Sequence, residues 1–128
     1  MMSNFDVITG SGVPQSHLPF SPAIRAGDYV FISGQASVDE HGKIITDSFA
    51  EECRRSFQNL GKILRGAGLD FSDVVQVRNY VGSQEDLLAF NQVYREFFNT
   101  PFPARTTIIG CLGTMLKFEV DAIAYAPK

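Results

Sequence analysis

The segment "LKFEVDAIAY", residues 116–125, carries the clearest alternation of side chains in the chain. Successive side chains of a β-strand point to opposite faces of a sheet, so every second residue shares one environment. One set is entirely apolar: Leu116, Phe118, Val120, Ala122 and Ala124. The other set mixes charged and apolar residues: Lys117, Glu119, Asp121, Ile123 and Tyr125. The segment therefore predicts a strand with one face in a core and one face of mixed character.

Two other segments have apolar residues every three or four positions, which is the spacing of amphipathic helices. The first begins at Ser48, which has the pattern of a capping box with Glu51, and ends at the glycines 66 and 68. The second covers residues 87–98 and ends before Pro101. The apolar positions are Phe49, Cys53, Phe57, Leu60, Ile63, Leu64 and Ala67 in the first, and Leu87, Phe90, Tyr94, Phe97 and Phe98 in the second. Each helix therefore has a single apolar stripe.

Further strands are predicted by short runs rich in β-branched and aromatic residues. Residues 5–8 favour a short first strand, residues 72–81 a longer one, and Arg105 begins another. Residues 28–33 and 43–46 flank a turn at Asp39 to Gly42, and together they predict a hairpin.

One domain, residues 1–128, accounts for all of these elements, because no repeat or long linker divides the chain. Two helices with one apolar stripe each pack most simply side by side on one face of a mixed sheet, which is an α+β layer structure. The other sheet face would then expose Ile123 and Tyr125 beside charged residues. We therefore predict that other subunits cover that face.

Composition argues against several classes of protein. The 11 basic residues are scattered and outnumbered by 14 acidic ones, so the chain lacks the electrostatic footprint of a nucleic-acid-binding protein. No apolar run reaches the ~18 residues that cross a bilayer, so we expect a soluble protein and no membrane partner. His17 and His41 share no ligand spacing with each other or with a cysteine, so we expect neither a metal site nor a histidine-activated nucleophile.

The two cysteines lie on separate elements without CxxC spacing, and no secretory signal precedes the predicted fold. We expect reduced thiols in a cytoplasmic protein. Cys111, near the end of a predicted strand, is interpreted as a small buried hydrophobic residue.

Two charged residues have both a structural and a functional interpretation. Arg105, in "NTPFPARTTIIG" (residues 99–110), could pack its stem at a strand edge, or its planar fork could hold a carboxylate. Glu119 could be solvated on its strand, or its carboxylate could hold a water for attack on a polar double bond. Spacing alone does not show whether the two residues meet.

Gly34 and Asn91 are weaker candidates. Gly34 in "ISGQ" could end a strand, or it could let a ligand approach the backbone. Asn91 lies between apolar helix residues, where a structural hydrogen bond is the commoner role.

In order along the chain, five segments resemble the signature segments of the RidA family, also called the YjgF family of reactive-intermediate deaminases. The segments are "PFSPAIRAGDYVFISGQASVDEHGKI", "RSFQNLGKILRGAGLDFSDVVQVRNYV", "FNQVYREFF", "FPARTT" and "KFEVDAIA", and they span about Pro19 to Ala124. The order and spacing of "SGQ", "FPAR" and the closing "E-x-x-A-I-A" are the most specific part. The resemblance implies the α+β fold of bacillus-type chorismate mutase and a homotrimer, with inward-facing sheets and ligand clefts between subunits.

The resemblance also implies a reaction, the hydrolysis of 2-imino acids or their enamine tautomers to 2-oxo acids and ammonia, without metal or organic cofactor. By the match to the family motifs, Arg105 would hold the carboxylate of a small-molecule substrate and Glu119 would position water. The backbone at Gly34 would line the same cleft, and Asn91 would support it.

Two residues and one loop depart from the family pattern. Phe20 stands where a tyrosine is common and Thr107 where a cysteine is frequent, both at positions expected to contact ligand. "GCLGTML", residues 110–116, replaces a loop that often contains Leu-Pro. A second hypothesis follows, in which the chain is a non-catalytic binder of small carboxylates or a chaperone-like protein. A third, ribonuclease activity, is the weakest, because of the acidic balance and the lack of a histidine pair.

Overall fold

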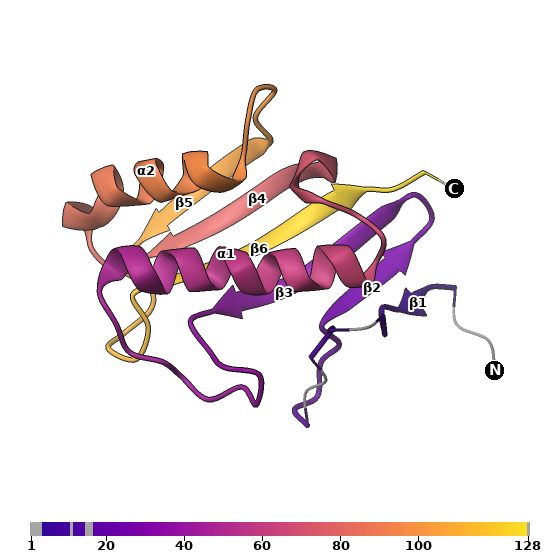
Figure 1. Ribbon diagram of the computed structural model, residues 1–128, viewed down its shortest axis with the longest axis horizontal. Helices are drawn as coiled ribbons and strands as arrows, with labels where there is room; N and C mark the ends of the chain where they lie inside the picture. Colours follow the sequence, from indigo (N-terminus) through magenta and orange to yellow (C-terminus); the bar gives the residue numbers. More distant parts are fainter. Residues whose placement is uncertain (1–3, 11, 15–16, 128) are drawn as a thin grey trace.

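A computed structural model describes residues 4–10, 12–14 and 17–127, and within them six strands form one mixed sheet (Figure 1). The strands are β1 (Asp6–Val7), β2 (Ala23–Ala26), β3 (Tyr29–Ala36), β4 (Val74–Val81), β5 (Ala104–Ile109) and β6 (Phe118–Tyr125). The helices are α1 (Phe49–Gly66) and α2 (Leu87–Phe97), and the 3-10 turns are η1 (Phe71–Asp73) and η2 (Gln84–Asp86). The mixed α+β fold predicted from the sequence is confirmed.

The strand order is β1-β2-β3-β6-β4-β5, so β6, which comes last along the described chain, lies near the middle of the sheet. β6 is antiparallel to both of its neighbours, β3 and β4. β4 and β5 are parallel, and α2 forms the crossover that a parallel pair requires. α1 likewise connects β3 to β4 and leaves room between them for β6.

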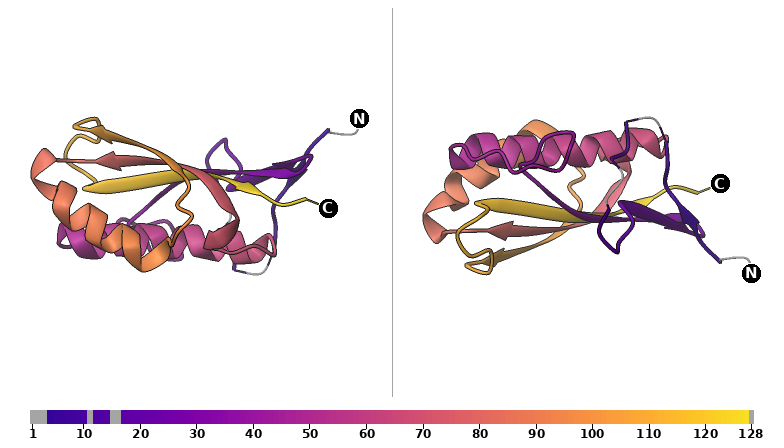
Figure 2. Two further views of the ribbon diagram at one scale, coloured as in Figure 1. Left: turned by 90° about the horizontal axis from the view of Figure 1, so that it is seen from above. Right: turned by 90° about the horizontal axis from the view of Figure 1, so that it is seen from below.

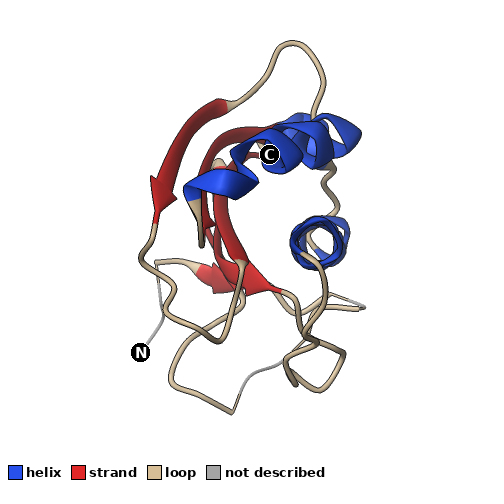
Figure 3. Cartoon of the chain, turned by 90° about the vertical axis from the view of Figure 1, so that its left-hand side faces the viewer, coloured by secondary structure: helices blue, strands red, loops and turns tan. Residues whose placement is uncertain are grey.

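Both helices cover the same face of the sheet (Figure 2). Viewed from one end, the strands curve around the two helices and leave the opposite face bare (Figure 3). From β6, Phe118, Val120 and Ala124 turn toward the helices and are completely buried. Phe57 of α1 packs against Phe118 and stacks on Phe97 of α2. The alternation of residues 116–125 thus places the core where it was predicted.

The start of α1 matches the prediction only in part. Ser48 caps the helix by accepting a hydrogen bond from the Glu51 N–H at 3.3 Å. The reciprocal half of the capping box does not form, because the Ser48 N–H donates to Asp47 at 2.8 Å. The neighbouring Glu52, 1% exposed, turns inward and accepts the Asp47 N–H at 3.0 Å.

The predicted hairpin of residues 28–33 and 43–46 is wrong. β3 pairs along one edge with β2 and along the other with β6, so neither edge is free for residues 43–46. That segment contributes a single isolated bridge, between Val38 and Ile44.

The interpretation of Cys111 as buried is also wrong. β5 ends at Ile109, and the chain then turns at Gly110 and Gly113, which have φ angles of 86° and 70°. Cys111 lies in this turn and is exposed, whereas Cys53 of α1 is buried. The turn glycines, rather than the preceding β-branched run, determine its environment.

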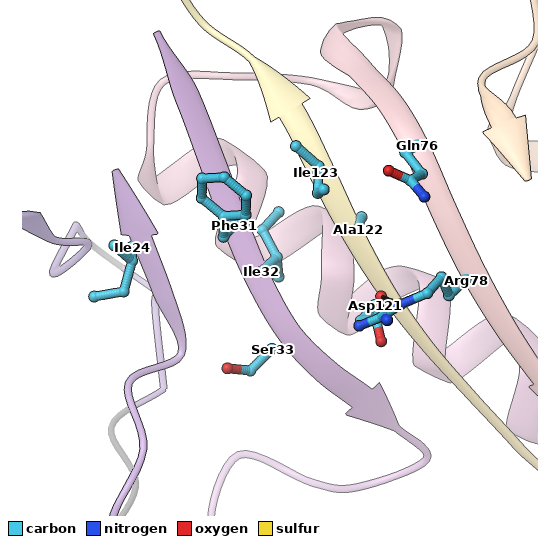
Figure 4. A pocket seen from close by; sticks show the side chains of 9 residues that line it. All are labelled: Ile24, Phe31, Ile32, Ser33, Gln76, Arg78, Asp121, Ala122 and Ile123. Atoms are coloured by element: carbon cyan, nitrogen blue, oxygen red, sulfur yellow. Dashed lines mark hydrogen bonds and ion pairs between the residues drawn. The ribbon is translucent and has the colours of Figure 1, made fainter. Parts of the chain in front are cut away.

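The uncovered face of the sheet has the mixed character expected from β6. Tyr29, Phe31 and Tyr125 are each between 43% and 45% exposed there. A hollow of about 390 Å³ lies on this face, where Phe31 and Ile123 stand near the ion pair of Arg78 and Asp121 (Figure 4). Covering of this face by further copies of the chain stays a prediction.

Candidate functional site

Arg105, the second residue of β5, is held against α2. Its Nη2 donates to Asn91 Oδ1 at 2.8 Å, and the central carbon of its guanidinium lies 4.8 Å from the ring centroids of both Phe90 and Tyr94. Stacking and a side-chain hydrogen bond both restrict the orientation of the fork. Arg105 is nevertheless exposed to solvent. The cation is therefore pre-oriented and still accessible to an anion.

The register of β5 explains this placement. Arg105 pairs with Val77 of β4, which is completely buried beneath the helices. Paired residues of neighbouring strands share a face of the sheet, so Arg105 lies on the helix-covered side. Thr107 lies two residues further along the same face and is half-buried, opposite Asn79.

Glu119 lies on the opposite face. Its neighbours Phe118 and Val120 are completely buried toward the helices, so its own side chain turns to the uncovered face of the sheet. The residue is half-buried. Burial first, and then the negative charge of nearby Asp121, raise the pKa of Glu119 above its usual value. A carboxylate of this kind holds and releases a proton more readily near neutral pH than an exposed one.

Gly34 lies directly beside Glu119. The register of β3 and β6 shifts between Ile32 and Gln35, so two residues of β3, Ser33 and Gly34, oppose Asp121 alone. Such a β-bulge bends a strand locally and is common next to active sites. A Cβ added to Gly34 would lie 2.1 Å from Oε1 of Glu119, so only glycine leaves the carboxylate in place. Gly34 is therefore inside β3, and its interpretation as a strand terminator is wrong.

Phe20 lies near Gly34, across a groove that both residues line. It is 52% exposed and lies just before β2. Phe20 and Gly34 both line a groove of about 690 Å³. The sequence-predicted residues thus fall into two groups. One group is Arg105, Asn91 and Thr107 on the helix-covered side; the other is Glu119, Gly34 and Phe20 on the uncovered side or at its edge.

One chain does not bring Arg105 and Glu119 together. β4 separates their strands, and Arg105 is level with Val77 whereas Glu119 is level with Tyr80, three residues further along. Two strand spacings and this offset put their Cα atoms roughly 14 Å apart, with side chains on opposite faces. A small substrate cannot touch both within one chain, so a site that uses both needs two copies.

Sequence reasoning missed the two rings that hold Arg105. Phe90 and Tyr94 were assigned to the core, and they are buried, but each also presents a face to the guanidinium. The signal was available, because Tyr94 lies three residues after Asn91 and four after Phe90, the two spacings that make side chains neighbours on a helix surface. The pairing with β5 that brings Arg105 to this helix is non-local and is not readable from spacing.

None of the helices among the described residues is both long and apolar enough to cross a lipid bilayer.

Comparison with known proteins places this geometry in a family context. The family model described as Endoribonuclease L-PSP matches residues 11–126. A RutC family protein of Pyrococcus horikoshii is 34% identical over 122 residues, which cover 94% of this chain and 97% of that protein. The 2-iminobutanoate/2-iminopropanoate deaminase of Homo sapiens is 31% identical over 120 residues, which cover 92% of this chain and 88% of that protein.

Two solved structures have closely similar folds. RidA from an Antarctic Psychrobacter has a TM-score of 0.84 at 26% identity, with 94% of this chain and 98% of that chain covered. TdcF of E. coli, solved with bound serine, has a TM-score of 0.82 at 28% identity, with coverage of 94% and 98%.

Proposed function

The chain belongs to the RidA (YjgF) family, and from that premise we propose that it hydrolyses 2-imino acids, or their enamine tautomers, to 2-oxo acids and ammonia. The sites would be clefts between the subunits of a homotrimer. The observation that carries the proposal is the division of the candidate residues between two faces. Arg105 is pre-oriented on the side of α2, and Glu119 is held beside Gly34 on the other face.

Assembly of copies supplies what one chain lacks. The uncovered sheet face carries Glu119 together with exposed aromatic residues such as Phe31 and Tyr125. Burial of such a face by neighbouring copies is favourable, at roughly 25 cal/mol per Å² of apolar surface removed from water. In the proposed trimer, the Arg105 edge of one copy would lie beside the Glu119 face of the next.

In this cleft Arg105 would bind the substrate carboxylate through its planar fork, with Asn91 and the two rings fixing the fork's orientation. Glu119 of the neighbouring copy would accept a proton from a water as the water oxygen bonds to C2 of the protonated imine. The product of this step is a carbinolamine. Glu119 then returns the proton to nitrogen and the C–N bond breaks. C2 becomes a carbonyl as its hydroxyl proton passes to the departing ammonia, which leaves as ammonium.

The raised pKa of Glu119 suits both halves of this cycle, because the group must take a proton and then give it back. Free imines already hydrolyse in water, so the site needs only to hold the anion and aim one water. The names of the relatives support this reaction class, since several are 2-iminobutanoate/2-iminopropanoate deaminases. The serine bound to TdcF also carries the carboxylate that Arg105 would recognise.

The test is deamination of imines generated in situ by an amino-acid oxidase. We expect Arg105→Ala to lower kcat/KM by at least about 100-fold, because the anion loses its anchor. Arg65→Ala, which removes an exposed arginine from the last turn of α1, is the matched control and should retain activity. Full activity of Arg105→Ala would remove the proposal.

Phe20 favours one alternative, a binder of small carboxylates without turnover. Its ring is exposed but lacks the hydroxyl that a tyrosine at this position would offer to ligand or water. In that case 2-oxo acids would bind in an Arg105-dependent manner while the rate of imine hydrolysis stayed at the uncatalysed value. Phe20→Tyr would then be the variant in which to look for restored turnover.

A further inference from the structure

The groove that Gly34 and Phe20 share is larger than a three- or four-carbon imino acid requires. It measures about 690 Å³, within the 300–1,000 Å³ range of pockets that bury drug-sized ligands. It runs between the segment that precedes β2 and the end of β3. Leu18 and Phe20 line one wall, and Ala36 and Val38 line the other.

The groove begins beside Glu119. Gly34 lines the groove and is also the residue whose added Cβ would meet Oε1 of that carboxylate. Ala36, the next residue on the same face of β3, lines the groove and pairs with Glu119 across the strands. A substrate whose C2 lay next to Glu119 would therefore have its side chain at the mouth of this groove.

The lining chemistry restricts what the groove can hold. Phe20 and Leu18 are 52% and 54% exposed and line the groove, so they present apolar surface to it. The charged residues of the lining have both signs, with Asp39 and Glu40 acidic and Lys62 basic, so they favour no second charge on the substrate. The apolar surface of Leu18, Phe20, Ala36 and Val38 fits a bulky, uncharged side chain.

We propose that this groove is a side-chain pocket, and that it makes the chain selective for 2-imino acids with branched aliphatic or aromatic side chains over 2-iminopropanoate. The inference rests on the proposed function. Burial of one methylene changes binding by roughly fourfold, and hydrophobic pockets discriminate a single methylene by about 10- to 200-fold. The isobutyl and benzyl side chains of the imines of leucine and phenylalanine should therefore raise kcat/KM at least about tenfold.

The experiment compares imines made in situ from alanine, leucine and phenylalanine. It is run on the wild type, on Leu18→Asp, which places a charge in the groove wall, and on Leu88→Asp. Leu88 is a 73% exposed leucine of α2 that does not line the groove, so it is the matched control. We expect the leucine-to-alanine ratio of kcat/KM to fall at least about tenfold in Leu18→Asp and to be unchanged in Leu88→Asp.

A binding measurement can test the pocket independently of the proposed deaminase activity. Calorimetric titration of the assembled protein with 4-methyl-2-oxopentanoate and with pyruvate measures the affinity for a large and a small side chain without turnover. If no imine is hydrolysed, the proposed function fails, and tighter binding of the branched oxo acid that is lost in Leu18→Asp would still support the pocket. Preference for the alanine-derived imine, or a ratio that Leu18→Asp leaves unchanged, would overturn the inference.

Discussion

Gly34 and Glu119 are in direct contact across the β3–β6 bulge, with no room between them for even a methyl group. The carboxylate is the flexible end of a side chain, so an added Cβ would displace it without disturbing the strands. Gly34→Ala should therefore fold, with a free energy of unfolding within about 1 kcal/mol of wild type. It should lose at least about tenfold in kcat/KM, because misplacement of a proton-transfer group by 1 Å is costly. Urea denaturation and the imine assay measure the two effects.

Glu119→Gln provides the comparison for that variant. If Gly34 acts by placing Glu119, the double variant should be little worse than Glu119→Gln alone, since the two substitutions remove one interaction. Fully additive losses would show that Gly34 acts on its own.

Separation of Arg105 and Glu119 on opposite faces predicts complementation between two inactive chains. A trimer mixed from Arg105→Ala and Glu119→Gln subunits contains interfaces in which both residues are intact. Random equal mixing leaves about one interface in four complete, so activity should recover to about a quarter of wild type. The measurement is deaminase activity after co-expression, with each variant alone as the reference. Absence of recovery in trimers verified by sedimentation would mean that the two residues do not serve one site.

The raised pKa of Glu119 predicts the acidic limb of the pH profile. The ionised carboxylate is the form that accepts a proton from water, so kcat/KM should fall as pH drops through a pKa above the usual 4.5. Asp121→Asn removes a negative charge that contributes to the shift, and it also leaves the Arg78 cation without its partner. Both changes favour the ionised form, so the limb should move to lower pH. The profile of Glu119→Gln gives the background, and a limb that stays in place in Asp121→Asn would contradict the assignment.

Buried Glu52 predicts a stability effect away from the candidate site. Its carboxylate accepts the N–H groups of Asp47 at 3.0 Å and Lys117 at 3.1 Å, and the Lys117 ammonium lies 3.2 Å away. Glu52→Ala would leave two partly buried backbone donors without their acceptor and should lower the free energy of unfolding by roughly 2–4 kcal/mol. Glu85→Ala, at an exposed position in η2, should change it by less than about 0.5 kcal/mol. Urea unfolding at one fixed protein concentration is the measurement, and equal effects in the two variants would contradict the role of Glu52.

The sequence predicted the helices and strands correctly where apolar residues recur at a regular spacing over many positions. The apolar stripes of α1 and α2 and the alternation of β6 identified their elements and the sides they bury, because helix and strand periods are local properties. The pairing of residues 43–46 was wrong for the opposite reason. It assumed that β3 pairs with the nearest extended segment, whereas its edges are taken by β2 and by β6, which is more than eighty residues away.

The candidate site likewise combines features that the local sequence shows with features that depend on long-range strand pairing. The chemistry of Arg105 and Glu119 was visible in their residue types, and their roles came from the resemblance to RidA proteins. Their arrangement on opposite faces depends on the register of β5 and β6 against β4, which joins segments distant in the chain. No local pattern contains that information. The β3 bulge that presses Gly34 against Glu119 is likewise visible only in three dimensions.

The place of β6 in the sheet also bears on how the protein is made. Because β6 lies between β3 and β4, those two strands cannot be joined until residues 118–125 have left the ribosome. Until then the growing chain holds two halves of a sheet with unpaired edges, a state prone to aggregation. The native topology therefore requires residues 118–125, and association through the uncovered face of the sheet has to follow their insertion between β3 and β4.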